Sequence, residues 1–200
     1  MQIKNNKILV YIYLLIFVLF NINLNAEEFN ISAKEIVVDK ENETLIGKGS
    51  VVATDTDGNI IYADKIEYKK SNEYLLAEGN VKIIDKKGNI LKGVKASYDK
   101  LNEVINTYNN TEIELNDSYK LTTQSVVYDT KEKIISSNKN SIFTDIDGNI
   151  IETSKFQYNI INNLFSSIGK IKISDVNENI YFFKEIYVDT KKKEMIGSDI

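Results

Sequence analysis

A spacing of thirty residues governs this chain. Tyr68, Tyr98, Tyr128 and Tyr158 lie thirty residues apart, without insertion or deletion between them. The same interval relates a set of apolar positions: Leu45, Leu75, Ile105, Ile135, Phe165 and Met195. A short and regular repeat predicts one supersecondary unit stacked on copies of itself. We therefore expect an elongated fold in which each unit packs on its neighbours.

Within each repeat, the residues alternate as in a β-strand with one buried face. From Leu75 to Ile83 every second residue is apolar or small, whereas Glu78, Asn80 and Lys82 fall on the other face. The chain contains no proline, which suits a continuous ladder of paired strands. Asn, Asp and Gly tolerate positive φ, so Asp-Gly-Asn at 57–59 and 147–149 predicts tight hairpins. These patterns indicate an all-β fold of antiparallel strands.

The apolar positions change phase within one strand of each repeat. Ile61 and Ala63 occupy odd positions, whereas Ile66 and Tyr68 occupy even ones. A shift of one residue sends every side chain to the opposite face, so this strand requires a bulge or a corner. We expect each unit to bend between two sheets near Asp64 and Lys65.

Glycine recurs in the middle of the other long strands. Gly49, Gly79 and Gly169 imply either a sharp bend and close approach of backbones or an interior with room to spare. Asn109 and Lys139 stand at the equivalent positions of two units. Because a buried unpaired lysine costs several kcal/mol, this line of positions is expected at an opening. A sheet curled into a trough with one accessible edge has that property, whereas a fully closed barrel does not.

The first 26 residues have the pattern of a secretory signal peptide. Lys4 and Lys7 precede thirteen apolar residues from Ile8 to Phe20, a run shorter than the ~20 residues that cross a bilayer. Cleavage is predicted after Ala26, and an uncleaved membrane anchor is the alternative. In both cases the repeats, residues 27–200, are expected to be exported.

The composition argues against several classes of function. The chain has no cysteine and no histidine, so disulfides, thiol chemistry, the usual general base and the commonest metal ligand are missing. Without residues 1–26 the net charge is −6, from 23 basic and 29 acidic residues, which disfavours nucleic acid as a ligand. Calcium binding by the loops at Asp55 and Asp145 is a weaker alternative, because their glycine comes fourth rather than sixth. We expect no enzymatic activity, no cofactor and no metal site.

The repeat resembles a known family once its residues are set side by side. Ala63-Asp64-Lys65-Ile66-Glu67-Tyr68 and the stretch from Leu75 to Asp85 are similar to the recurrent motifs of OstA-like domains, and the resemblance covers residues 29–200. These domains occur in lipopolysaccharide (LPS) transport, in the periplasmic bridge LptA and in the N-terminal part of the outer-membrane assembly protein LptD. The resemblance implies an antiparallel β-jellyroll, a V-shaped two-sheet trough whose apolar lumen shelters acyl chains.

That resemblance implies positions and partners as well as a fold. The lumen would be lined by Val38, Leu45, Val51, Ile66, Tyr68, Leu75, Ala77, Val81, Ile83, Tyr98, Ile105, Ile113, Val126, Tyr128, Ile135, Phe143, Phe156, Tyr158, Phe165, Ile171 and Ile173. An edge formed by Ile31, Ala33, Ile36 and Val38 would dock other jellyroll proteins by strand addition. The ligand would be the lipid A acyl chains of LPS, in the periplasm.

The end of the chain bears on which member of the family it resembles. The sequence from Lys193 to Ile200 stops in the middle of a long strand of the repeat. We therefore expect the protein to continue into an outer-membrane barrel with a lipoprotein partner, as in an LPS-assembly protein, and a bridge protein of LptA type is the close alternative. From another class, an exported structural or adhesive β-solenoid with a closed core is equally compatible with the repeat. Lys139 is the discriminating residue, since a closed core should not tolerate it at an inward position.

Overall fold

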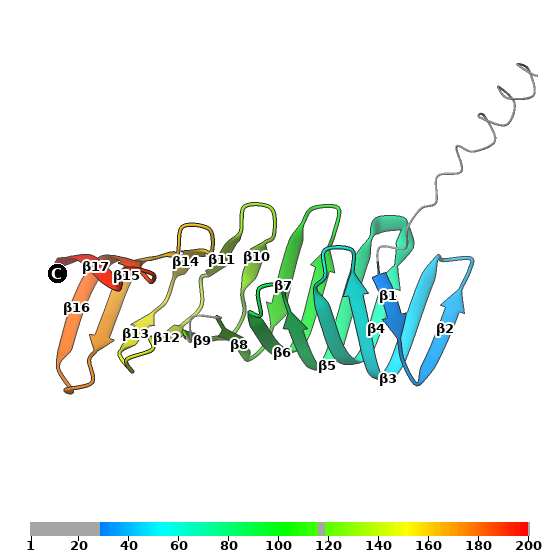
Figure 1. Ribbon diagram of the computed structural model, residues 1–200, viewed down its shortest axis with the longest axis horizontal. Helices are drawn as coiled ribbons and strands as arrows, with labels where there is room; N and C mark the ends of the chain where they lie inside the picture. Colours follow the sequence, from blue (N-terminus) through cyan, green and yellow to red (C-terminus); the bar gives the residue numbers. More distant parts are fainter. Residues whose placement is uncertain (1–28, 116–118, 200) are drawn as a thin grey trace, which may run out of the picture.

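The computed structural model describes residues 29–115 and 119–199, so the predicted signal peptide lies outside the described part. That part is composed of β-strands and a single 3₁₀ turn, η1 (Lys70–Asn72). The strands are β1 (Phe29–Ser32), β2 (Glu35–Asp39), β3 (Thr44–Asp55), β4 (Ile60–Lys69), β5 (Tyr74–Ile84), β6 (Ile90–Asp99), β7 (Val104–Tyr108), β8 (Thr111–Glu114), β9 (Lys120–Thr123), β10 (Val127–Asp129), β11 (Ile134–Ser137), β12 (Ser141–Thr144), β13 (Ile150–Thr153), β14 (Phe156–Asn159), β15 (Leu164–Ser174), β16 (Ile180–Asp189) and β17 (Glu194–Asp199). They follow one another along the long axis of the molecule, from β2 at one end to β16 and β17 at the other (Figure 1).

Every strand pairing is antiparallel, which confirms the predicted all-β antiparallel class. The long strands β3 to β6 each pair with the next one. Beyond β6 the ladder divides into two arms, one of β7, β10, β11 and β14 and the other of β8, β9, β12 and β13, which rejoin at β15. Ten strands therefore pair in a closed ring within one hydrogen-bonded sheet. The two-sheet trough expected from the sequence is not confirmed, because the described strands form one hydrogen-bonded sheet.

The predicted change of phase is confirmed in β4. Ile61, Ala63, Ile66 and Tyr68 are all buried, and the pairing of β4 with β5 shifts register between Tyr62 and Lys65. Across this shift β4 advances three residues and β5 four, so the extra residue of the bulge lies in β5. The apolar residues of β4 thus stay buried on both sides of the shift.

Backbone conformation explains the recurrent glycines. Gly49 and Gly79 have φ of 77° and 76°, and each begins a bulge that continues in a second residue of positive φ, Ser50 or Asn80. Gly169, at the equivalent position of β15, has a φ of 126°. Glycine adopts these angles without the Cβ penalty that other residues meet. Of the two readings of the sequence, the bend is therefore correct, and spare interior room is not needed.

Two rows of turns border the sheet. The first rim comprises the turns at 40–43, 70–73, 100–103, 130–133, 160–163 and 190–193, and the second rim those at 55–59, 85–89, 145–149 and 175–179. Successive turns of the first rim are joined by backbone hydrogen bonds, such as Thr130 N to Glu103 O at 2.8 Å. In the second rim an aspartate closes each turn. The Asp85 carboxylate, for example, accepts bonds from Lys87 N, Asn89 N and Asn89 Nδ2.

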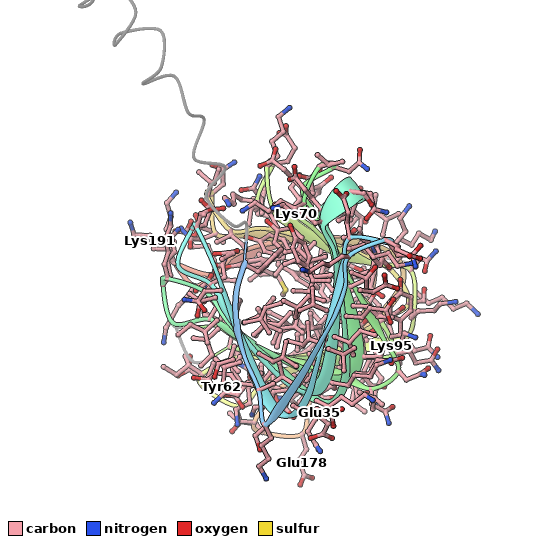
Figure 2. The ribbon with its side chains drawn as sticks, turned by 90° about the vertical axis from the view of Figure 1, so that its right-hand side faces the viewer. Glu35, Tyr62, Lys70, Lys95, Glu178 and Lys191 are labelled. Carbon is pink, nitrogen blue, oxygen red and sulfur yellow. The ribbon has the colours of Figure 1, made fainter. Side chains whose placement is uncertain are left out.

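A single apolar core runs the length of the sheet. It joins Phe29 near one end to Ile186 near the other. Figure 2, which looks along the long axis, shows the interior filled with side chains, with Lys70 and Lys191 of the first rim on the upper side and Glu35 on the lower side. Tyr62 and Lys95 point outward on opposite flanks. Burial of each large apolar side chain contributes about 1.5–3 kcal/mol, so this core is the main stabilising feature of the described fold.

Candidate functional site

The structure brings most of the predicted lumen residues together in the apolar core. Eighteen of them are buried: Val51, Ile66, Tyr68, Leu75, Ala77, Val81, Ile83, Tyr98, Ile105, Ile113, Val126, Ile135, Phe143, Phe156, Tyr158, Phe165, Ile171 and Ile173. Leu45 and Tyr128 are half-buried. Val38 departs from the prediction, because it is 60% exposed. It lies on β2, which pairs only with β3 among the described strands, so no further unit covers it.

Side chains fill the interior between the two arms. Phe165 is fully buried and stacks on Phe143 and Phe156, with ring centroids 4.8 and 5.7 Å apart. Tyr119 stacks on the other side of Phe143 at 5.4 Å. The space left among these rings measures about 10 Å³, no more than a single water needs. An acyl chain therefore enters this region only if side chains move aside.

An apolar pocket opens between the two rims in the middle of the molecule. Its volume is about 220 Å³. Isoleucine and leucine side chains form its floor and walls: Ile83, Leu91, Ile105, Ile113, Leu115 and Ile135. Its border comes from both rims, with Asp85 and Lys86 on one side and Glu103, Thr130 and Lys133 on the other. We call this opening the mouth pocket, because it is where the apolar core meets solvent.

Tyr128 stands inside the mouth pocket. Burial of its ring, together with the nearby negative charge of Asp85, raises its pKa to about 12. Both causes oppose the phenolate. The phenol therefore stays neutral over the whole physiological range and adds no charge to the pocket.

Two lysines form salt bridges between the rims, one on either side of the mouth pocket. Lys100, in the first rim, places its Nζ 3.2 Å from Thr56 Oγ1 and 3.6 Å from Asp57 Oδ2 in the second rim. The same ammonium lies 6.0 Å from the ring centroids of Phe29 and Tyr98. Towards the other end, Lys193 Nζ lies 3.1 Å from Asp147 Oδ2. The mouth pocket therefore lies between two salt bridges that connect the rims.

The charges around the mouth pocket balance. Lys86 and Lys133 border it, as do Asp85 and Glu103, while Lys100 and Asp57 pair with each other. The Asp85 carboxylate is already engaged by its own turn. Recognition of a ligand here therefore depends on apolar burial rather than on net charge.

The two arms separate along a line that crosses the middle of the molecule. The strands are interrupted between β7 and β8, β9 and β10, β11 and β12, and β13 and β14. We call this line of interruptions the seam. Lys139 lies in it and is exposed. Lys139 therefore reaches solvent, as expected for a position at an opening. Because it lies in a break between strands, it does not distinguish an open lumen from a closed core.

Buried hydroxyl groups replace the missing backbone pairing along the seam. Seven such residues are buried: Thr107, Thr111, Thr123, Ser137, Ser141, Thr153 and Ser167. Thr107 and Thr111 share a hydrogen bond of 2.6 Å, and Val126 N donates to Thr107 Oγ1 at 2.9 Å. Ser167 Oγ donates to Lys155 O at 2.8 Å. Strand alternation does not predict this network, although the concentration of serine and threonine in the middle repeats is a signal of it.

The predicted docking edge is only partly apolar and free. Ile36 and Val38 on β2 are 46% and 60% exposed, whereas Ile31 and Ala33 are half-buried beside the core. The opposite end also presents apolar side chains, with Phe182 58% and Ile196 75% exposed. Both ends of the described sheet therefore offer an apolar edge strand.

The described residues include no cluster of three or more acidic side chains that could hold a metal ion. The Asp55 and Asp145 loops considered for calcium use their first carboxylate to close the turn, as at Asp85. No helix in the described ranges has the length and apolar character to cross a membrane.

Comparison with known proteins gives only distant likenesses. No protein-family model and no curated protein matches the chain. Among solved structures, LptH of Pseudomonas aeruginosa, the LptA homologous periplasmic component of the lipopolysaccharide transport device, is similar with a TM-score of 0.48 and 16% identity, covering 54% of this chain and 79% of that one. The TCP10 domain of Danio rerio CPAP, in complex with a STIL peptide, gives a TM-score of 0.17 and 10% identity over 86% and 99%. Neither likeness is strong enough to carry an argument about function.

Proposed function

We propose that this chain is a non-enzymatic carrier of LPS that shelters acyl chains in its apolar core and admits them through the mouth pocket. The observation that carries the proposal is the opening of a continuous apolar core between two rims of polar turns. The resemblance of the repeat to OstA-like domains supplies the identity of the lipid. The predicted signal peptide supports a location in the periplasm.

The energetics of an acyl chain suit this site. Each CH₂ group taken out of water contributes about 0.8 kcal/mol, and the walls of the mouth pocket offer aliphatic contacts without a polar floor. The interior is filled in the described state. Uptake of a long chain therefore requires the rims to part, with Lys100 and Lys193 releasing their carboxylates, while the sugars and phosphates stay in solvent.

Its partners follow from the two apolar ends of the sheet. We propose that β2 at one end and β17 at the other extend the ladder into further jellyroll domains by strand addition. The chain would serve as the periplasmic part of an outer-membrane assembly protein, with a barrel and its lipoprotein partner beyond it. A bridge protein of LptA type is the alternative within the same function.

A second function, from another class, is favoured by a specific observation. The closed ring of ten strands and the rings packed around Phe165 are what a structural or adhesive β-solenoid with a closed core requires. In that case the apolar core serves stability alone, and the mouth pocket is a gap between turns.

Photo-crosslinking in cells that make LPS distinguishes the two functions. A photoreactive amino acid at Ile83 faces the mouth pocket, whereas the same amino acid at Lys82, the preceding residue of β5, faces outward. The carrier function predicts a glycolipid adduct at Ile83 and none at Lys82. An adduct at neither position, or at Lys82 alone, would support the closed structural solenoid.

A further inference from the structure

A groove on the outer side of the seam is larger than the mouth pocket. Its volume is about 930 Å³, within the range of ligand-binding clefts. It is lined from β8, β9, β12, β13, β15 and β16, which are consecutive neighbours in the sheet. The groove therefore runs across the strands rather than along them.

One wall of this groove is a row of polar side chains. Each comes from the position at which its strand meets the seam: Asn110, Gln124, Asn140, Ser154 and Lys170. All five are exposed. Strands lie about 4.8 Å apart, so the row presents one polar group per strand over roughly 19 Å. Three of the five side chains are amides, Ser154 adds a hydroxyl and Lys170 adds an ammonium. A periodic set of donors and acceptors of this kind matches a ligand that repeats its own polar groups along an extended chain.

These side chains are not used by the fold. In the described residues 29–115 and 119–199, none of the five makes a hydrogen bond or ion pair with another protein side chain or with the backbone. Asn80 and Asp64 occupy the equivalent positions of an earlier repeat, and their side chains bond to each other, with Asn80 Nδ2 donating to Asp64 Oδ2 at 2.8 Å. A bulge in this part of the sheet keeps β4 and β5 paired. The free amides are thus a property of the middle repeats, where the strands are interrupted.

The remaining lining of the groove is partly apolar, and its carboxylates are paired with lysines. Ile142 and Phe182 are 46% and 58% exposed there. Glu112 and Glu152 pair with lysines, at 3.3 Å from Lys92 and 2.7 Å from Lys172. A sugar residue has the same two kinds of surface, since its ring CH groups are apolar and stack on aromatic side chains while its hydroxyls bond to amides.

We propose that this groove binds an extended oligosaccharide, laid across strands β8, β9, β12, β13, β15 and β16. The position is on the outer side of the sheet, so the proposal is independent of acyl-chain uptake through the mouth pocket. A peptide that binds by strand addition would lie parallel to the strands at an edge, and the direction of the groove disfavours it.

The test uses nuclear magnetic resonance of the isotope-labelled chain titrated with chitohexaose. We expect shifts of backbone amide resonances confined to residues around the groove, and a much weaker response to the single sugar N-acetylglucosamine. Gln124→Ala combined with Asn140→Ala should weaken binding at least tenfold. The matched control is Asn162→Ala with Asn177→Ala, two exposed asparagines in turns away from the groove, which should leave the affinity unchanged.

Three results would overturn the assignment. Chitohexaose that shifts no groove resonance would exclude the oligosaccharide, and equal weakening by both double variants would show that binding lies elsewhere. A polar heptapeptide that shifts the same resonances as strongly would make the groove a peptide site. None of these results affects photo-crosslinking at Ile83, so the two proposals fail separately.

Discussion

The ammonium of Lys100 lies 3.6 Å from the Asp57 carboxylate, and this contact joins turns of two different repeats across the opening of the apolar core. The Lys100 side chain is only 15% exposed, and its ammonium also faces the rings of Phe29 and Tyr98. The closed state of the described molecule therefore depends on a lysine that serves both as an ion-pair partner and as an apolar cover.

Replacement of Lys100 should lower stability more than loss of a surface charge would. We expect Lys100→Ala to reduce the free energy of unfolding by about 1–2 kcal/mol, because packing and cation–π contacts are lost with the charge. Asp57→Asn, which removes only the exposed partner, should cost less than about 1 kcal/mol. Urea denaturation checks both values against Lys131→Ala, an exposed lysine of the next turn. Equal effects of Lys100→Ala and Lys131→Ala would contradict this role.

The buried hydroxyls of the seam make a second stability prediction. Thr123→Val keeps the shape of the side chain but removes the acceptor of the Ser141 hydroxyl, at 2.9 Å, and the donor to Asn140 O. We expect a loss of about 1–3 kcal/mol, the cost of leaving buried polar groups unpaired. Thr122→Val, on the exposed face of the same strand, should change stability by less than about 0.5 kcal/mol. Similar midpoints for the two variants in thermal denaturation would refute the hydroxyl network.

Two glycines at different positions of the repeat should respond in opposite ways to alanine. Gly79 has a φ of 76°, and a Cβ there would collide with the side chain of Asp64, so Gly79→Ala should cost about 2 kcal/mol or more. At Gly93 the nearest atom to a Cβ would be 3.9 Å away. Gly93→Ala should therefore be neutral or stabilise by up to about 1 kcal/mol, because it restricts the unfolded chain. Chemical denaturation measures the free energy of unfolding of both variants. A larger loss of stability in Gly93→Ala than in Gly79→Ala would be inconsistent with the bulge.

The raised pKa of Tyr128 predicts how the stability of the fold changes at high pH. Its pKa is raised to about 12 in the folded chain and is about 10 in an unfolded one. Below pH ~10 the phenol is neutral in both states. As the pH rises from about 10 through about 12 only the unfolded state ionises, so stability falls. Tyr128→Phe should show a smaller fall than wild type, measured by urea denaturation at several pH values. Tyr62→Phe, on the outer flank, is the control, and an unchanged fall in Tyr128→Phe would contradict the burial of the phenol.

Local features of this fold could be predicted from the sequence because they depend on neighbours within one strand or turn. The bulge near Asp64 follows from the change of phase between Ala63 and Ile66, and the hairpins follow from their Asp-Gly-Asn turns. The apolar interior also follows from alternation, apart from Val38. Val38 fits the alternation, but it lies on β2 at the end of the described sheet, where no further repeat covers it.

The candidate site could be predicted only in part, because it depends on which repeats face each other across the sheet. Lys100 and Asp57 belong to turns whose juxtaposition is set by the curvature and twist of the whole ladder, and no pattern within one strand contains that information. Equivalence to Gly79 predicts that Lys139 lies at an opening of the fold. The interruption of the strand at that point turns it outward, and buried hydroxyls such as Thr123 take over the pairing.

The most direct test of acyl-chain entry through the mouth pocket uses the absence of cysteine from the chain. Lys86→Cys and Lys133→Cys place two thiols on opposite rims of the pocket, where a cleavable bifunctional thiol reagent can join them. Binding of a fluorescent long-chain fatty acid is then measured before joining, after joining and after cleavage. The carrier function predicts at least tenfold weaker binding in the joined state and full recovery on cleavage. Binding that stays unchanged when the rims are joined would contradict entry between them.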